Sequence, residues 1–134
     1  SPTPAQPNAP ECRSHNYWPL DHAQHRLELS WIGTPRIGAT NRIQIAKAAP
    51  NAVTSMYLAA GPGMLPIGGG LYILLGLGLD GPFPIPTNAQ GTASVSVTIP
   101  NSAALKGQSA FLQLVGTDSQ GVTLSNGTQV RICK

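Results

Sequence analysis

Glycine and proline are spread so densely through this chain that a fold of long helices is excluded. The sequence holds 15 Gly and 13 Pro among 134 residues, and both residue types interrupt helices. Between these breaks apolar and polar residues alternate, which is the pattern of a half-buried strand. The clearest case is 92–99, where Val95, Val97 and Ile99 share one face. The pattern predicts short strands joined by turns.

The strand signals recur at a spacing typical of an all-β sandwich. They cover 25–32, 41–46, 53–59, 71–75, 92–99, 110–115, 122–125 and 128–133, and a short helical turn is expected around 102–105. Strand signals about 8–12 residues apart predict an antiparallel β-sandwich of seven or eight short strands, Ig-like or jelly-roll-like. We expect residues 25–134 to form this domain. Residues 1–24, whose first ten include four prolines, are expected to form an extended Pro-rich tail.

The two cysteines, Cys12 and Cys133, lie near opposite ends of the chain. An even count predicts a disulfide that ties the tail to the last strand, with a bridge between subunits or two free thiols as the alternatives. Disulfides persist in oxidising compartments, so we expect an extracellular or cell-surface protein whose signal peptide has been removed. The longest apolar run, 64–79, contains Pro66 and five glycines, so we expect no membrane-spanning segment.

Charge is scarce and unevenly placed. Lys and Arg number 8 and Asp and Glu 5, for a net charge of +3. The basic residues are scattered, which argues against a nucleic-acid partner. Between Lys47 and Lys106 the only charged residue is Asp80. Either Ser, Thr and Asn keep this surface soluble, or other subunits or glycan cover it. Within this segment, Gly76 and Gly78 either admit another backbone closely or mark a bend at a strand end.

No sequence pattern in this chain predicts catalysis. There is no Gly-x-Ser-x-Gly elbow, and Gly68–Gly70 lacks the Lys-Ser/Thr of a phosphate-binding loop. All three histidines lie within the first 25 residues, so a catalytic base would have to come from the tail. The carboxylates are isolated from one another in sequence, unlike the paired acids of glycosidases. We expect no enzymatic activity and no cofactor.

The tail carries residue types that bind zinc. Cys12, His15, His22 and His25 have pairwise spacings near those of zinc sites. They match no standard motif, and a disulfide at Cys12 would remove one ligand. The three histidines are therefore weak metal candidates, and we expect a metal-free protein in which they are solvated or hydrogen-bonded.

Two short motifs have alternative interpretations. Tyr17-Trp18-Pro19-Leu20 is an anchor that docks the tail into an apolar groove, or else its Tyr17-Trp18-Pro19 part is an exposed platform for stacking sugars. Asn126-Gly127-Thr128 is a glycosylation sequon, but Asn-Gly between two strand signals also indicates a turn or bulge. We expect the anchor and the turn or bulge.

The region from Pro35 to Cys133 resembles a known type of domain. It runs from Pro35-x-Ile37-Gly38 through an Asn-Arg-Ile-Gln-Ile strand, Leu-Tyr-Ile-Leu-Leu and Val-x-Val-x-Ile99-Pro100 to Val122-Thr-Leu-Ser-Asn-Gly127. This succession of turns and core positions resembles an uncharacterised secreted β-sandwich (Ig-like) domain of extracellular and surface proteins of environmental bacteria. The resemblance implies secretion and a structural or adhesive role.

Together these features predict a secreted, non-enzymatic structural subunit. Its N-terminal tail would lie on the next copy of the chain and build a homopolymer, either an extracellular filament or a surface layer. The alternative is a monomeric module that binds an extracellular glycan through exposed aromatic side chains. Size-exclusion chromatography or negative-stain images distinguish the two.

Overall fold

The computed structural model describes residues 12–19, 23–76 and 78–134, and within these ranges it is almost entirely β-structure. The described residues form eleven strands and one 3₁₀ turn. The strands are β1 (Ser14–Tyr17), β2 (Glu28–Ile32), β3 (Thr40–Ala46), β4 (Val53–Ala59), β5 (Pro62–Gly68), β6 (Leu71–Leu75), β7 (Asp80–Pro86), β8 (Ala93–Thr98), β9 (Ser109–Asp118), β10 (Gly121–Leu124) and β11 (Gly127–Arg131), and the turn η1 is Ala103–Leu105. The predicted all-β fold is confirmed.

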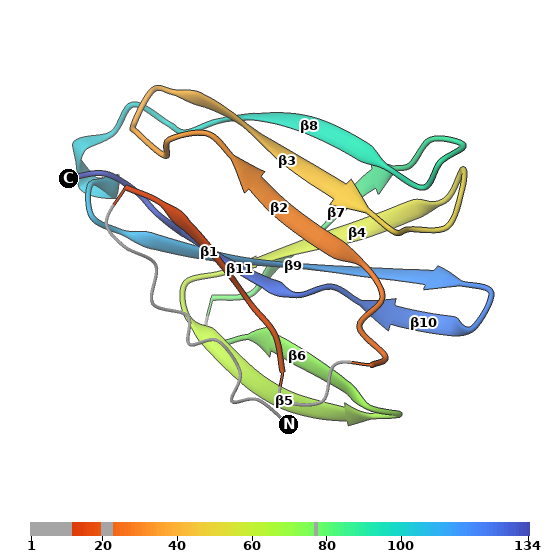
Figure 1. Ribbon diagram of the computed structural model, residues 1–134. Helices are drawn as coiled ribbons and strands as arrows, with labels where there is room; N and C mark the ends of the chain where they lie inside the picture. The colour runs from red at the N-terminus through yellow and green to blue at the C-terminus, as the bar shows by residue number, and fades with distance from the viewer. Residues whose placement is uncertain (1–11, 20–22, 77) are drawn as a thin grey trace.

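Two antiparallel sheets face each other and enclose the main core (Figure 1). The larger sheet has the order β1-β11-β9-β4-β7, with β10 also paired to β9, and the smaller sheet has the order β2-β3-β8. Alternation in sequence places the inward residues: along β3, Ile43 and Ile45 are buried while Arg42 and Gln44 are exposed. They pack against Leu114 of β9 and other buried residues of the facing sheet, and this burial is the main source of stability.

The Asn-Gly motif forms a bulge. β10 and β11 pair with the same edge of β9, and the register shifts by one residue between them. At this point the Asn126 side chain is 1% exposed. Its Oδ1 accepts from the Leu29 N–H at 2.9 Å and its Nδ2 donates to the Leu29 carbonyl at 3.0 Å. The predicted turn or bulge is thus found as a bulge that joins the two sheets. Asn126 in this position is enclosed by protein and cannot carry a glycan.

Three strands lie in segments that we did not predict as strands, namely β1, β5 and β7. β5 and β7 contain five prolines between them, at Pro62, Pro66, Pro82, Pro84 and Pro86. Both strands lie at the edge of a sheet. Proline is tolerated there because its missing N–H faces no partner strand.

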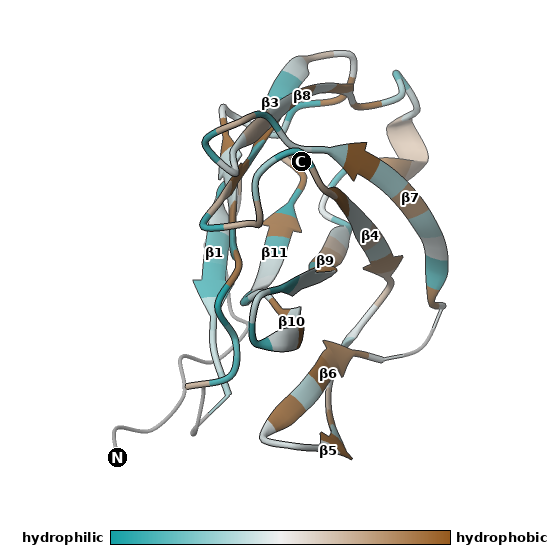
Figure 2. Ribbon diagram, turned by 90° about the vertical axis from the view of Figure 1, so that its right-hand side faces the viewer, coloured by the Kyte–Doolittle hydropathy of each residue, from teal (hydrophilic) through white to brown (hydrophobic). Residues whose placement is uncertain are grey.

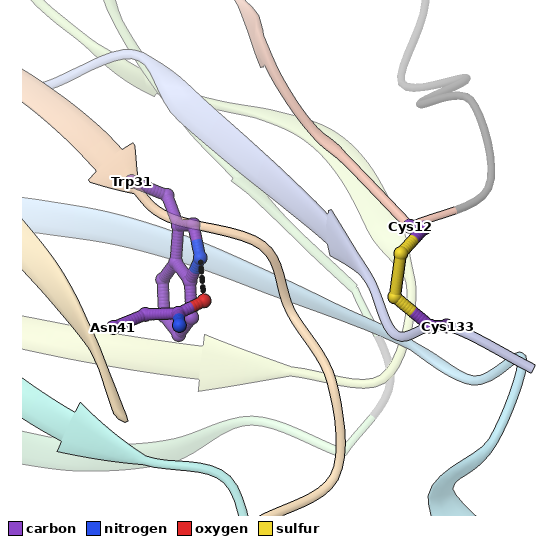
Figure 3. The surroundings of a disulfide bond; sticks show 4 residues. All are labelled: Cys12, Trp31, Asn41 and Cys133. Atoms are coloured by element: carbon purple, nitrogen blue, oxygen red, sulfur yellow. Dashed lines mark hydrogen bonds between the residues drawn. A yellow bond between two sulfur atoms is a disulfide. The ribbon is translucent and has the colours of Figure 1, made fainter. Parts of the chain in front are cut away.

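Part of the expected tail belongs to the sandwich. β1 pairs with β11 of the same chain, from Ser14 opposite Val130 to Tyr17 opposite Gly127. Just before β1, Cys12 forms a disulfide with Cys133 (Figure 3). The predicted disulfide is confirmed, and it lies within one chain. The assignment of all of residues 1–24 to an extended tail therefore fails for β1, whereas residues 1–11 and 20–22 lie outside the described residues.

Removing the disulfide should cost stability because it joins Cys12 to Cys133 across a sequence separation of 121. We expect the Cys12→Ser, Cys133→Ser double variant to unfold with a free energy lower by about 2–5 kcal/mol. Urea unfolding followed by circular dichroism measures this change. The reduced wild type is the control and should match the double variant. A double variant within about 0.5 kcal/mol of the oxidised protein would contradict the expectation.

Candidate functional site

The most unusual part of the molecule is the β5–β6 hairpin, which forms a small sheet of its own beside the larger one (Figure 2). In its register Leu65 lies opposite Ile73 and Pro66 opposite Tyr72. From Gly61 to Leu79 the sequence has a single side chain with an N–H or O–H group, that of Tyr72. The hairpin is therefore an apolar element that needs polar partners for its backbone from elsewhere in the fold.

Three side chains supply those partners. The Tyr72 N–H donates to Nε2 of His25 at 3.1 Å, and the Tyr72 carbonyl accepts from Nε2 of Gln113 at 3.1 Å. The Leu74 N–H donates to Oε1 of Gln113 at 3.0 Å, and the Leu74 carbonyl accepts from the Tyr17 hydroxyl at 2.8 Å. Among the described strands β6 pairs only with β5. Its other edge is thus attached to the sandwich through side chains instead of a ladder of strand hydrogen bonds.

Gln113 and His25 are themselves held by Ser125. Gln113 is 2% exposed, and its Nε2 also donates to the Ser125 carbonyl at 3.1 Å. Nδ1 of His25 lies 3.0 Å from the same carbonyl. Because the Tyr72 N–H donates to Nε2, that nitrogen carries no proton, and Nδ1 is the donor to Ser125. His25 is therefore a neutral, hydrogen-bonded side chain, and its ring stacks on that of Tyr72 with centroids 6.2 Å apart.

The chain beside His25 is fixed by its neighbour Arg26. The Arg26 N–H donates to the Thr123 hydroxyl at 2.9 Å. The Arg26 guanidinium binds both carboxylate oxygens of Asp118, at 2.7 and 2.9 Å. This bidentate pair holds the pKa of Asp118 below its usual range. The segment before β2 is in this way attached to β10 and the end of β9, which sets the position of the His25 ring.

Tyr17 fills the space between the hairpin and the larger sheet. It is 3% exposed, packs edge-on against Phe111 with ring centroids 6.5 Å apart, and forms a second small core with Leu74. Burial raises the pKa of its hydroxyl well above the ordinary value, so the group remains a donor. A side chain at Gly127 would collide with the Tyr17 ring, which explains the glycine at that position.

The two predicted close-packing glycines lie at the base of the hairpin. The Gly76 N–H donates to the Gly61 carbonyl at 2.9 Å, and a side chain at Gly76 would collide with the carbonyl of Pro62. Gly78 has a φ of +76° and lies against Ala60. The close approach is therefore between two segments of this chain, where the hairpin leaves and rejoins the larger sheet.

An apolar surface surrounds a pocket where the hairpin meets the sheet. The pocket has a volume of about 250 Å³ and is lined by Tyr57, Ile73, Leu75, Leu79, Gln113 and Val115. Leu79 at its rim is 56% exposed, and Leu65 is 59% exposed. Leu65 shares a face of the hairpin with Ile73, because directly opposed residues point to the same side. We call Leu65, Ile73 and Leu79, with the pocket, the hairpin patch. Met64 and Ile67 on β5 are also exposed.

The predicted anchor is engaged inside its own domain. Tyr17 and Pro19 are buried and Trp18 is half-buried, while Leu20 lies outside the described residues. Of the alternative stacking platform, Tyr17 is therefore buried and Trp18 is only partly exposed. Trp31 is engaged as well, since its indole N–H donates to Oδ1 of Asn41 at 2.8 Å (Figure 3).

The weak metal candidates do not form a centre in the described part of the chain. His15 lies in β1 and His25 is hydrogen-bonded, while His22 lies outside the described residues. Residues 12–19, 23–76 and 78–134 contain no group of three or more His, Cys, Asp or Glu side chains placed to hold a metal ion. The same ranges contain no helix that is long and apolar enough to cross a membrane.

Comparisons with known proteins give one structural neighbour. No family model matches the chain, and no curated protein matches it. Among solved structures it is similar to the superoxide reductase (neelaredoxin) from Ignicoccus hospitalis, at 9% identity and a TM-score of 0.47, over 81% of this chain and 80% of that chain. At this level of similarity we transfer no activity from that protein.

The prediction of a structural subunit that forms a filament through its tail is wrong. The tail residues that were to dock on another copy, Tyr17 and Pro19, are buried in their own domain. β1, which was to add to a neighbour's sheet, is already paired with β11.

Replacing Gln113 tests whether side chains hold the hairpin. Gln113→Leu keeps the approximate volume but leaves the Leu74 N–H without its acceptor. We expect the free energy of unfolding to fall by about 2–3 kcal/mol, the cost of unpaired buried backbone groups. The control is Gln44→Leu, at an exposed position of β3. Urea unfolding compares the two variants, and equal, small changes in both would contradict this account of the attachment.

Proposed function

We propose that this chain is an extracellular binding module that docks an apolar segment of a partner protein on its hairpin patch. The observation that carries the proposal is a formed pocket with exposed Leu65 and Leu79 beside it, on a hairpin fixed to the sandwich. Contiguous exposed apolar surface is unfavourable in water and marks interaction sites in soluble domains. The stretch from Gly61 to Leu79, which includes the hairpin, contains no charged side chain, as expected for a surface that a partner covers.

The size and lining of the pocket favour a side chain as its occupant. Its volume of about 250 Å³ lies below the roughly 300–1,000 Å³ of typical small-molecule sites. One bulky apolar side chain fits a space of this kind, as in the anchor pockets of protein interfaces. The Gln113 amide at its wall already bonds to Tyr72, Leu74 and Ser125. Recognition in the pocket is therefore by shape and apolar contact.

The partner is held by side chains and not by strand addition. The free edge of β6 is covered by Gln113, His25 and Tyr17. The N–H and carbonyl of Tyr72 point towards those side chains and away from β5. Pro66 lies opposite Tyr72, so its backbone nitrogen points away from β6, to the outer edge of β5. Proline has no N–H to donate, so this edge is a poor template for another strand.

The attachment of the hairpin contributes to affinity. Four backbone groups of β6, two at Tyr72 and two at Leu74, are bonded to side chains of the sandwich. The hairpin patch is thus ordered before a partner arrives. A pre-organised surface loses less conformational entropy on binding than a mobile one.

The location is part of the proposal. The disulfide between Cys12 and Cys133 supports an oxidising compartment, where such bonds persist. The resemblance to secreted β-sandwich domains of environmental bacteria, which we infer from the sequence alone, implies the same location. A surface or secreted protein of this kind meets its partner outside the cell.

Selection from a displayed random-peptide library tests the proposal. We expect peptides enriched on the wild type to share one bulky apolar residue. Their affinity should fall at least about tenfold for Leu79→Asp, which places a charge at the pocket rim, because an anchor residue contributes about 2 kcal/mol or more. The control is Val53→Asp, which places the same charge at a 61% exposed position. Val53 is the first residue of β4, at the end of the strand away from the hairpin.

Circular dichroism first establishes that both variants keep the β-rich fold. Failure to enrich apolar-anchored peptides would overturn the proposal. Peptides that bind Leu79→Asp as tightly as the wild type would overturn it as well.

A further inference from the structure

A second apolar space lies inside the sandwich, between the two facing sheets. It has a volume of about 250 Å³, and its lining includes Trp31, Met56, Val97, Leu105, Leu112 and Ile132. It is separate from the hairpin patch: Met56 and Leu58 of β4 line it, whereas Tyr57 between them lines the pocket of the patch. The larger sheet therefore separates the two spaces.

The few polar side-chain groups at the lining are already hydrogen-bonded to other side chains. Thr98 is the only lining residue with a hydroxyl, and this hydroxyl is bonded to that of Thr40 at 2.9 Å. The Trp31 indole N–H, the other polar group at the wall, donates to Asn41. Among the described residues every buried side-chain nitrogen and oxygen has a hydrogen-bond partner. A water molecule needs two to four polar partners to occupy a cavity, so this one favours an apolar occupant.

The cavity reaches the surface near η1. Pro100 is exposed and Leu105, the last residue of η1, is half-buried, and both line the space. The segment that carries them connects β8 of the smaller sheet to β9 of the larger sheet (Figure 1). A ligand can enter there without separating the two sheets.

We propose that this inter-sheet cavity binds a small uncharged molecule of hydrocarbon character, about the size of two aromatic rings. A cavity of roughly 150 Å³ lined by Leu, Ile and Phe binds benzene, so a space of about 250 Å³ accepts a larger ring system. The ring of Trp31 at the wall provides a surface on which an aromatic ligand stacks. An empty space of this size lowers stability, so a molecule that fills it stabilises the folded chain.

Naphthalene is the probe for the test, and the full oxidised chain is the sample. We expect saturable binding of one naphthalene per chain and a rise in the melting temperature. Val97→Phe fills the cavity and should weaken binding at least about tenfold. The matched control is Val115→Phe, which fills the pocket of the hairpin patch instead and should leave binding unchanged.

Leu105→Trp, which narrows the entrance, replaces Val97→Phe if that variant does not fold. Loss of binding in the cavity-filling or entrance variant, with binding kept in Val115→Phe, supports the proposal. Two results would overturn it: binding that does not saturate, or binding that is lost in Val115→Phe and kept in the cavity variant.

Discussion

The amide of Gln113 forms the contact on which the functional part of the structure depends. From the middle of β9 it accepts a hydrogen bond from Leu74 and donates to Tyr72 and Ser125. Gln113 thereby supplies hydrogen bonds to β6 that a neighbouring strand would otherwise supply. His25 and Tyr17 bond the remaining backbone groups of Tyr72 and Leu74. Without these bonds the backbone of an apolar hairpin would lose its polar partners, and placing it against the sheet would be unfavourable.

The apolar surface follows from this attachment. Once β6 is fixed, Leu74 and Leu75 are buried against the larger sheet, while Leu65 and Leu79 remain in solvent beside a pocket. The same strand, β4, separates this surface from the cavity inside the sandwich. The chain thus has an outer pocket, for which we propose a partner's side chain, and an inner cavity, for which we propose a small apolar molecule, and the two proposals are open to independent tests.

Sequence reasoning succeeded where one face of a strand is buried. The alternation of 92–99 and of Ile43 with Ile45 predicted β8 and β3, because an apolar side chain at every second position is visible in the sequence itself. It failed for β5 and β7, whose prolines indicate a loop unless the strand is known to lie at an edge. The role of Gln113 had one visible signal, a single amide within the apolar run Phe111–Val115. Its partners, 39 to 41 residues away in β6, depend on tertiary packing that no local pattern reveals.

Native-state hydrogen exchange tests most directly whether side chains fix the hairpin to the sandwich. The account predicts that the amide protons of Tyr72 and Leu74 exchange as slowly as those of Leu112 and Leu114 in β9, because His25 and Gln113 hold them in the same cooperative unit. Fast exchange at Tyr72 and Leu74, at the rate of exposed turns and with β9 still protected, would contradict it. The hairpin would then open independently of the sandwich, and the patch would not be preformed.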